Sequence, residues 1–132
     1  MFESMEQAIA ILKNPTESSL KRVEAVRFLG ELVSEKAIQI LVETLEDDDY
    51  GVRWAAADEL ARLGEKAAPA VLRKLLDPNA SARVFEMAAH IFKNNSDILL
   101  RSKAEALARA LESDHPIEAM TEASKLLNEL TE

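Results

Sequence analysis

The amino-acid sequence predicts an all-α fold, a right-handed α-solenoid of about four antiparallel helix pairs. Apolar residues recur three and four positions apart along most of the 132 residues, as at Val23, Val26, Leu29 and Val33, which is the spacing of a buried helix face. Short clusters of Asn, Asp, Ser, Gly and Pro interrupt these stretches, and such residues cap or end helices. The chain also matches itself when it is shifted by 31 residues, which is typical of repeat proteins.

The first half of the chain is expected to form a capping helix and one helix pair. The helix at 2–13 has an apolar face, which could pack on the next helix or contact another chain; it consists of Phe2, Met5, Ile9 and Leu12. Thr16 can cap a helix over 17–32, and Ser34 can cap a helix over 35–46, because their hydroxyls can accept hydrogen bonds from free backbone amides. These two helices make the first pair, residues 17–46.

The second half is expected to form two further pairs and a terminal helix. Asp49 can cap a helix over 50–63, Gly64 can end it, and 66–76 completes the pair 50–76 before Asp77-Pro78. Asn79 can cap 80–93, and the polar run Asn94–Ser96 separates it from 97–112, which gives the pair 80–112. Pro116 begins the terminal helix, 116–130. All of residues 1–132 are expected to form a single domain.

The self-similarity sets these pairs in register. The 31-residue shift places Arg22, Ala25, Leu29 and Leu32 on Arg53, Ala56, Leu60 and Leu63. Small residues at the alanine positions let neighbouring helices approach closely. The period slips by about four residues at Asn94–Ser96, and the last helix is expected to resume the first-helix pattern, with Ala123 in the place of Ala56.

The units Arg22-Val-Glu-Ala25 and Arg53-Trp-Ala-Ala56, each continued by a leucine and a glycine, resemble HEAT-like repeats. They are most similar to the short type named after phycobilisome lyases, over roughly residues 16–130. The resemblance implies an armadillo-like solenoid whose second helices line a concave groove. Members mostly act as protein-binding scaffolds, while minorities handle bilins, hydroxylate a lysine derivative at a metal site, or excise alkylated DNA bases. Val84 and Met120 replace the repeated arginine, so an arginine ladder is expected to stop after the second repeat.

Composition and the absence of catalytic motifs exclude several classes of function. A net charge of −8 and a pI near 4.9 disfavour nucleic acid and anionic membrane surfaces, and the lack of Cys fits a reducing, cytoplasmic location. His90 and His115 lack the His-Glu pairing of the metal-dependent hydroxylases and are expected to be structural. We therefore expect no catalytic, cofactor or metal site, and no enzymatic activity.

Two local features have competing interpretations. The acidic run Glu46–Asp49 could cap the next helix, offer an acidic docking patch or hold a metal. Trp54 lies one turn before Asp58, an arrangement that could resemble the base-excising members, but an acidic chain lacks a track for DNA. Trp54 could instead pack between repeats, or it could anchor a protein partner together with Tyr50.

The remaining candidate site is the groove of the second helices. In one interpretation this groove is an ordinary solvent-exposed helix face. In the other it is a binding surface, on which five basic residues bind an acidic peptide. The candidate residues are Gln39, Glu43, Arg73, Lys74, Arg101, Lys103, Glu105 and Arg109. The sequence thus favours an adaptor that binds a protein or peptide, and in the binding interpretation of the groove this ligand is acidic. The adaptor is expected to be a monomer or a weak homodimer. The alternatives are an accessory subunit in bilin chromophore attachment and a domain of a larger assembly protein.

Overall fold

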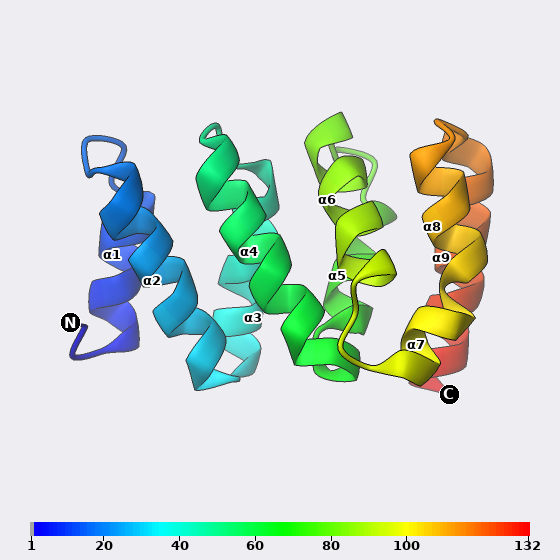
Figure 1. Ribbon diagram of the computed structural model, residues 1–132, viewed down its shortest axis with the longest axis horizontal. Helices are drawn as coiled ribbons and strands as arrows, with labels where there is room; N and C mark the ends of the chain where they lie inside the picture. Colours follow the sequence, from blue (N-terminus) through cyan, green and yellow to red (C-terminus); the bar gives the residue numbers. More distant parts are fainter. Residues whose placement is uncertain (1) are drawn as a thin grey trace.

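The computed structural model describes residues 2–132, which form helices arranged in two layers (Figure 1). The first layer consists of α2 (Ser19–Leu32), α4 (Tyr50–Leu63), α6 (Ala82–Lys93) and α8 (Glu105–Glu112). The second layer consists of α1 (Met5–Lys13), α3 (Glu35–Glu43), α5 (Ala68–Leu75) and α9 (Pro116–Thr131). Three short elements connect them: the 3-10 turns η1 (Thr44–Glu46) and η2 (Gly64–Lys66), and the helix α7 (Ile98–Lys103). No strand occurs in this part of the chain, and the fold is an α-solenoid.

The core lies between the layers and along the contacts of successive first-layer helices. Ala25, Ala56 and Ala88 are fully buried where α2, α4 and α6 meet, and Leu29 and Leu60 are fully buried one turn later. Small side chains allow the helix axes to approach, and the leucines fill the space that remains. The predicted division between small and large positions is therefore confirmed in α2 and α4, whereas in α6 the place of Ala56 is taken by the larger, fully buried Met87.

Two helix starts follow the expected chemistry and two do not. The predicted cap at Asn79 is wrong, because α6 begins at Ala82 and its N-cap residue, Ser81, makes no side-chain cap bond. The Oγ of Ser34 accepts the backbone N–H of Ala37 at 3.1 Å, and Oδ1 of Asp49 accepts that of Val52 at 3.3 Å, so both predicted caps are confirmed. Helix α2 begins later than predicted because Ser18 supplies its cap. Thr16 instead bonds to the side chain of Asn14.

The segment predicted as one helix over 97–112 differs most from expectation. It breaks at Ala104 into α7 and α8, and α8 packs beside α6 in the first layer. Helix α9 then takes the second-layer place beside α5 and runs opposite to it (Figure 1). The third pair is therefore not an outer helix followed by an inner one, and α9 does not resume the first-helix position expected for 116–130.

The connection after α6 gives the physical reason for this change. The backbone N–H and the Oγ of Ser96 donate to the carbonyl oxygens of Ala61 and Arg62, at 3.0 and 2.8 Å. Asn95 is buried and donates to the carbonyl oxygen of Ile91. These bonds fix the loop to the end of α4, and from there α7 leads into α8, which returns along the first layer (Figure 1).

Candidate functional site

The acidic loop before α4 is a structural junction between repeats. Asp47 receives the guanidinium of Arg22 in a bidentate ion pair, and Nη1 of Arg53 donates to the carbonyl oxygen of Asp47 at 2.8 Å. Asp49 caps α4 and accepts a hydrogen bond from the hydroxyl of Ser19. This hydroxyl, with backbone N–H donors of α4, lowers the pKa of Asp49 because both stabilise the carboxylate.

The same loop also reaches the third repeat. Nη1 of Arg83 lies 2.7 Å from Oδ1 of Asp48 and 3.0 Å from the carbonyl oxygen of Glu46, and it lowers the pKa of Asp48. The arginine ladder therefore does not stop after the second repeat, because Arg83 makes the link one position before Val84. With its carboxylates engaged in this way, the run fits the capping interpretation.

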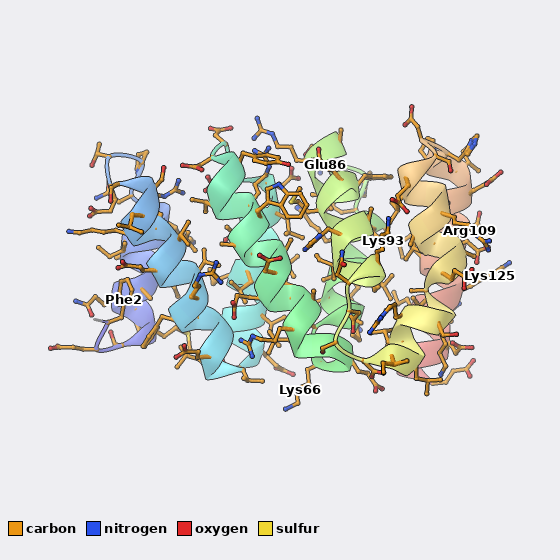
Figure 2. All side chains as sticks on the ribbon, viewed as in Figure 1. Phe2, Lys66, Glu86, Lys93, Arg109 and Lys125 are labelled. Carbon is orange, nitrogen blue, oxygen red and sulfur yellow. The ribbon has the colours of Figure 1, made fainter. Side chains whose placement is uncertain are left out.

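The predicted groove residues fall into two groups in different layers. Gln39 and Glu43 lie on α3, and Arg73 and Lys74 lie on α5, all in the second layer. The other four lie on α7 and α8, in the part of the chain that returns along the first layer: Arg101, Lys103, Glu105 and Arg109. Figure 2 shows the position of Arg109 on α8. The structure thus does not bring the five basic side chains into one cluster.

Most of these basic side chains also have partners within the chain. Nζ of Lys74 lies 3.5 Å from Glu46, Nζ of Lys103 lies 3.9 Å from Glu129, and Nη1 of Arg109 lies 3.6 Å from Glu105. Nε of Arg101 donates to the carbonyl oxygen of Asn95 at 3.2 Å. The exposed pairs of Lys103 and Arg109 contribute little to stability, but all of these contacts reduce the positive charge presented to a ligand.

The two aromatic residues singled out from the sequence lie together on the first layer. Tyr50 is 52% exposed, and its ring meets that of Trp54 edge to face, with centroids 5.7 Å apart. The guanidinium of Arg53 lies 5.1 Å from the centre of the Tyr50 ring. Trp54 is half-buried and contacts the ring of His90 on α6, at 4.3 Å between centroids.

His90 is held in a defined orientation by three neighbours. Its Nε2 lies 2.8 Å from Oδ1 of Asp58, and its Nδ1 lies 3.2 Å from Nδ2 of Asn94. An amide donating to Nδ1 fits the neutral imidazole that carries its proton on Nε2 and donates it to Asp58. His90 therefore has the structural contacts expected of it, and it also lines a pocket.

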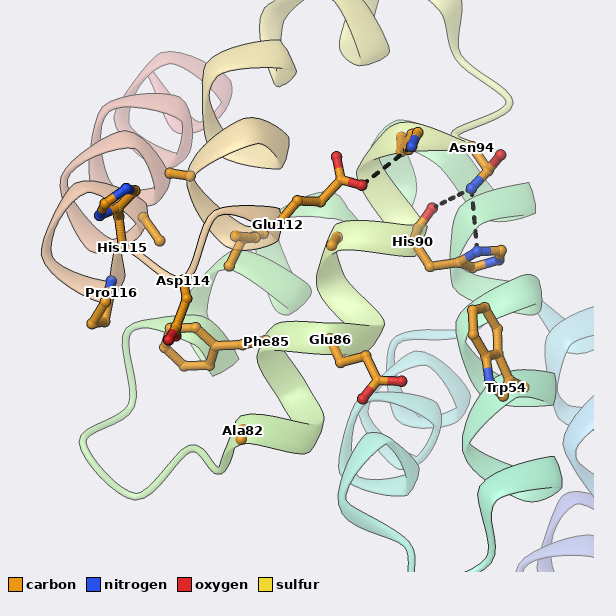
Figure 3. A pocket seen from close by; sticks show the side chains of 15 residues that line it. Trp54, Ala82, Phe85, Glu86, His90, Asn94, Glu112, Asp114, His115 and Pro116 are labelled. Carbon is orange, nitrogen blue, oxygen red and sulfur yellow. Dashed lines mark hydrogen bonds and ion pairs between the residues drawn. The ribbon is translucent and has the colours of Figure 1, made fainter.

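This pocket has a volume of about 850 Å³ and lies between α4, α6 and the turn that joins α8 to α9. Trp54 and His90 form one wall and His115 and Pro116 the opposite wall, with Phe85, Glu86 and Glu112 between them (Figure 3). Sequence reasoning found Trp54 but missed the pocket. Its walls come from segments far apart in the chain, and the turn from α8 to α9 reaches α6 only because α8 lies in the first layer.

Two further features bear on the expected absences. No helix in residues 2–132 is both long and apolar enough to cross a membrane. Within the same residues, no group of three His, Cys, Asp or Glu side chains could hold a metal ion. His115 is the N-cap residue that precedes α9; its side chain makes no cap bond and is exposed at the pocket wall.

Comparison with known proteins points to one family and one kind of relative. The family described as HEAT repeats matches residues 5–90. The phycocyanobilin lyase subunit alpha of a Picosynechococcus species is 39% identical over 82 residues, which cover 58% of this chain and 30% of that protein. The protein of the same name from Synechococcus elongatus is 37% identical over 89 residues, which cover 59% of this chain and 33% of that protein. The chain thus spans about a third of the length of these curated relatives.

The relatives confirm one expectation and overturn another. The resemblance to repeats of the phycobilisome-lyase type is confirmed. The expectation of no enzymatic activity is wrong by the same comparison, because both relatives are named as subunits of a lyase, which is an enzyme. The two-layer α-solenoid and the match over most of the chain lead to the same conclusion: the protein belongs to the HEAT-repeat family.

Proposed function

We propose that the protein is a helical-repeat scaffold that binds a protein partner, and that Tyr50 and Trp54 anchor the contact. The observation that carries the proposal is the position of these two rings. Tyr50 stands exposed on the first layer, and Trp54 joins it to the 850 Å³ pocket. Aromatic side chains beside a pocket are typical of the residues that dominate the free energy of binding between proteins.

The second-layer residues offer a second contact surface within the same proposal. Gln39, Glu43 and Arg73 are exposed on α3 and α5, the helices that would line the groove of a HEAT-repeat solenoid. Arg73 differs from the neighbouring Lys74, which is half-buried and close to Glu46. We therefore take Arg73 as the basic residue of this surface that is best placed to meet a ligand.

Affinity capture with matched variants tests the proposal. The bait would be the wild type, Tyr50→Ala, Arg73→Glu, or the control Leu20→Ala, which removes another exposed apolar side chain, on α2. A partner retained by the wild type and the control but lost by Tyr50→Ala supports the aromatic anchor, and loss with Arg73→Glu instead supports the second-layer surface. Equal capture by all four baits, or no specific capture, would overturn the proposal.

A second candidate function is a part in attaching a bilin chromophore, in keeping with the name of the relatives. The observation that favours it is the pocket itself, whose volume lies within the range of small-molecule sites. The ring of His90, whose Nε2 is hydrogen-bonded to Asp58, forms part of the wall of this pocket. Mixing the protein with phycocyanobilin tests this function. A changed absorbance spectrum that is weakened in Trp54→Phe supports it, and an unchanged spectrum rejects it.

A further inference from the structure

The charge of the pocket between α4, α6 and the α8–α9 turn is opposite to that of the predicted groove. Glu86, Glu112 and Asp114 line it, against one ammonium group, that of Lys93. Nζ of Lys93 lies 3.2 Å from Oε2 of Glu112, so this cation is already neutralised by a carboxylate of the pocket. Glu86 and Asp114 are exposed and make no ion pair in the described part of the chain.

The same pocket has an aromatic and apolar lining. Trp54 and Phe85 are both half-buried, and Ala89, Pro116 and Ala119 fill the spaces between the polar groups. Aromatic faces attract cations, and the effect strengthens as water is excluded. A ligand that suits this lining therefore combines a cationic end with an apolar stem.

We propose that the pocket receives a basic side chain, Lys or Arg, from the partner protein. The methylene stem would lie against Trp54 and the cationic group would meet the carboxylate of Glu86, while Phe85 and Asp114 extend the same apolar and acidic lining to the other end of the pocket (Figure 3). This inference rests on the proposed function as a protein-binding scaffold. It expects a basic partner segment, whereas the sequence favoured an acidic one. The basic residues of the predicted groove are divided between two layers, but the carboxylates of Glu86, Glu112 and Asp114 line a single pocket.

The single tryptophan of the chain reports on this pocket directly. Trp54 is the only Trp in the sequence, so a change in intrinsic fluorescence on titration reports the wall of the pocket. The probes are the capped pentapeptide Leu-Ala-Arg-Ala-Leu and its counterpart with Glu in place of Arg. The protein is the full chain, as the wild type, as Glu86→Gln/Asp114→Asn, or as the control Glu31→Gln/Glu35→Gln, which removes the same charge from exposed residues outside the pocket.

We expect the Arg peptide to change the fluorescence of Trp54 and the Glu peptide to leave it unchanged. The pocket variant should bind about tenfold more weakly, and the control should stay within about twofold, because loss of a close charge partner costs about one decade of affinity. Binding should also weaken as salt rises. Equal responses to both peptides, or equal affinity of the pocket variant and the wild type, would overturn the inference.

Two outcomes separate this inference from the proposed function. Partner capture that depends on Tyr50, together with no response to the Arg peptide, would overturn the basic-side-chain inference and leave the scaffold function in place. Quenching by phycocyanobilin with the same affinity in the wild type and the pocket variant, and no peptide response, would make the pocket a pigment site and overturn the inference.

Discussion

The contact between Gly30 of α2 and Glu59 of α4 provides the sharpest test of the packing. A Cβ added at Gly30 would clash with Oε1 of Glu59 and would lie 2.7 Å from its Cδ. Glu59 is itself buried, and ion pairs hold its carboxylate to Arg62 at 2.5 Å and to Arg27 at 3.4 Å. The carboxylate cannot move aside without losing these contacts, so Gly30→Ala must displace it or separate the two helices.

The expected magnitude follows from two opposing effects. Overpacking of a buried contact costs about 1–3 kcal/mol, and replacing Gly by Ala inside a helix gains about 1 kcal/mol. Gly30→Ala should therefore lower the free energy of unfolding by up to about 2 kcal/mol, measured by urea denaturation. Gly51→Ala is the matched control, because its Cβ meets only Asp49 Oδ1, at 3.4 Å, and it should gain about 0.5–1 kcal/mol.

A double-mutant cycle shows whether Glu59 is the cause. In a Glu59→Ala background the obstacle is absent, and the two released arginines keep access to water, since the side chain of Arg27 is 54% exposed and that of Arg62 is 52% exposed. Gly30→Ala should then be neutral or stabilising. If Gly30→Ala stabilises the wild type as much as Gly51→Ala does, the close approach of α2 and α4 is wrong.

Three further predictions concern stability. Val33 ends α2 in the left-handed region, with φ of 49° and ψ of 40°, so Val33→Gly should raise the midpoint of thermal unfolding by relieving about 1 kcal/mol of strain; a lower midpoint would contradict this. Leu60 and Leu72 are fully buried, so replacing either with Ala should lower the free energy of unfolding by about 2–5 kcal/mol, measured by urea denaturation. An unchanged midpoint in both variants would mean that the repeat register is wrong. The folded-state pKa of Asp49 lies below its ordinary value, chiefly through the hydroxyl of Ser19. This carboxylate therefore contributes stability above about pH 4, and the contribution is lost as the pH falls through the folded pKa. Ser19→Ala should raise the pKa of Asp49 in a carboxyl NMR titration and make the loss of stability at low pH smaller; an unchanged pKa would refute the assignment.

The regular part of the fold was predictable because each helix carries its own signals. Ser34 and Asp49 mark helix starts by local hydrogen bonds, and the alanine and leucine positions of α2 and α4 repeat at a fixed spacing. These signals depend on residues within one or two turns. The link made by Arg83 was missed by one position because a long, flexible side chain can reach the same carboxylate from a neighbouring site.

The reversal after α6 depends on contacts that have no local signal. Ser96 is bonded to the carbonyl oxygens of Ala61 and Arg62, and the sequence shows only a slip in the period at this point. The candidate site was accordingly predicted in part. Tyr50 and Trp54 were recognisable as aromatic residues at helical spacing, but His90 joins them through packing between different repeats.

The break in the repeat and the pocket have a common cause. If α8 had followed α6 as a second-layer helix, Glu112 and His115 would have no reason to lie opposite Trp54 on the first layer. Because Ser96 turns the chain back along that layer, the α8–α9 turn closes over α6 and completes the wall of the pocket. A natural repeat protein that departs from its own pattern at one place is expected to do so where function requires it. The experiments on Trp54 and its neighbours therefore test the segment in which this chain differs most from a regular solenoid.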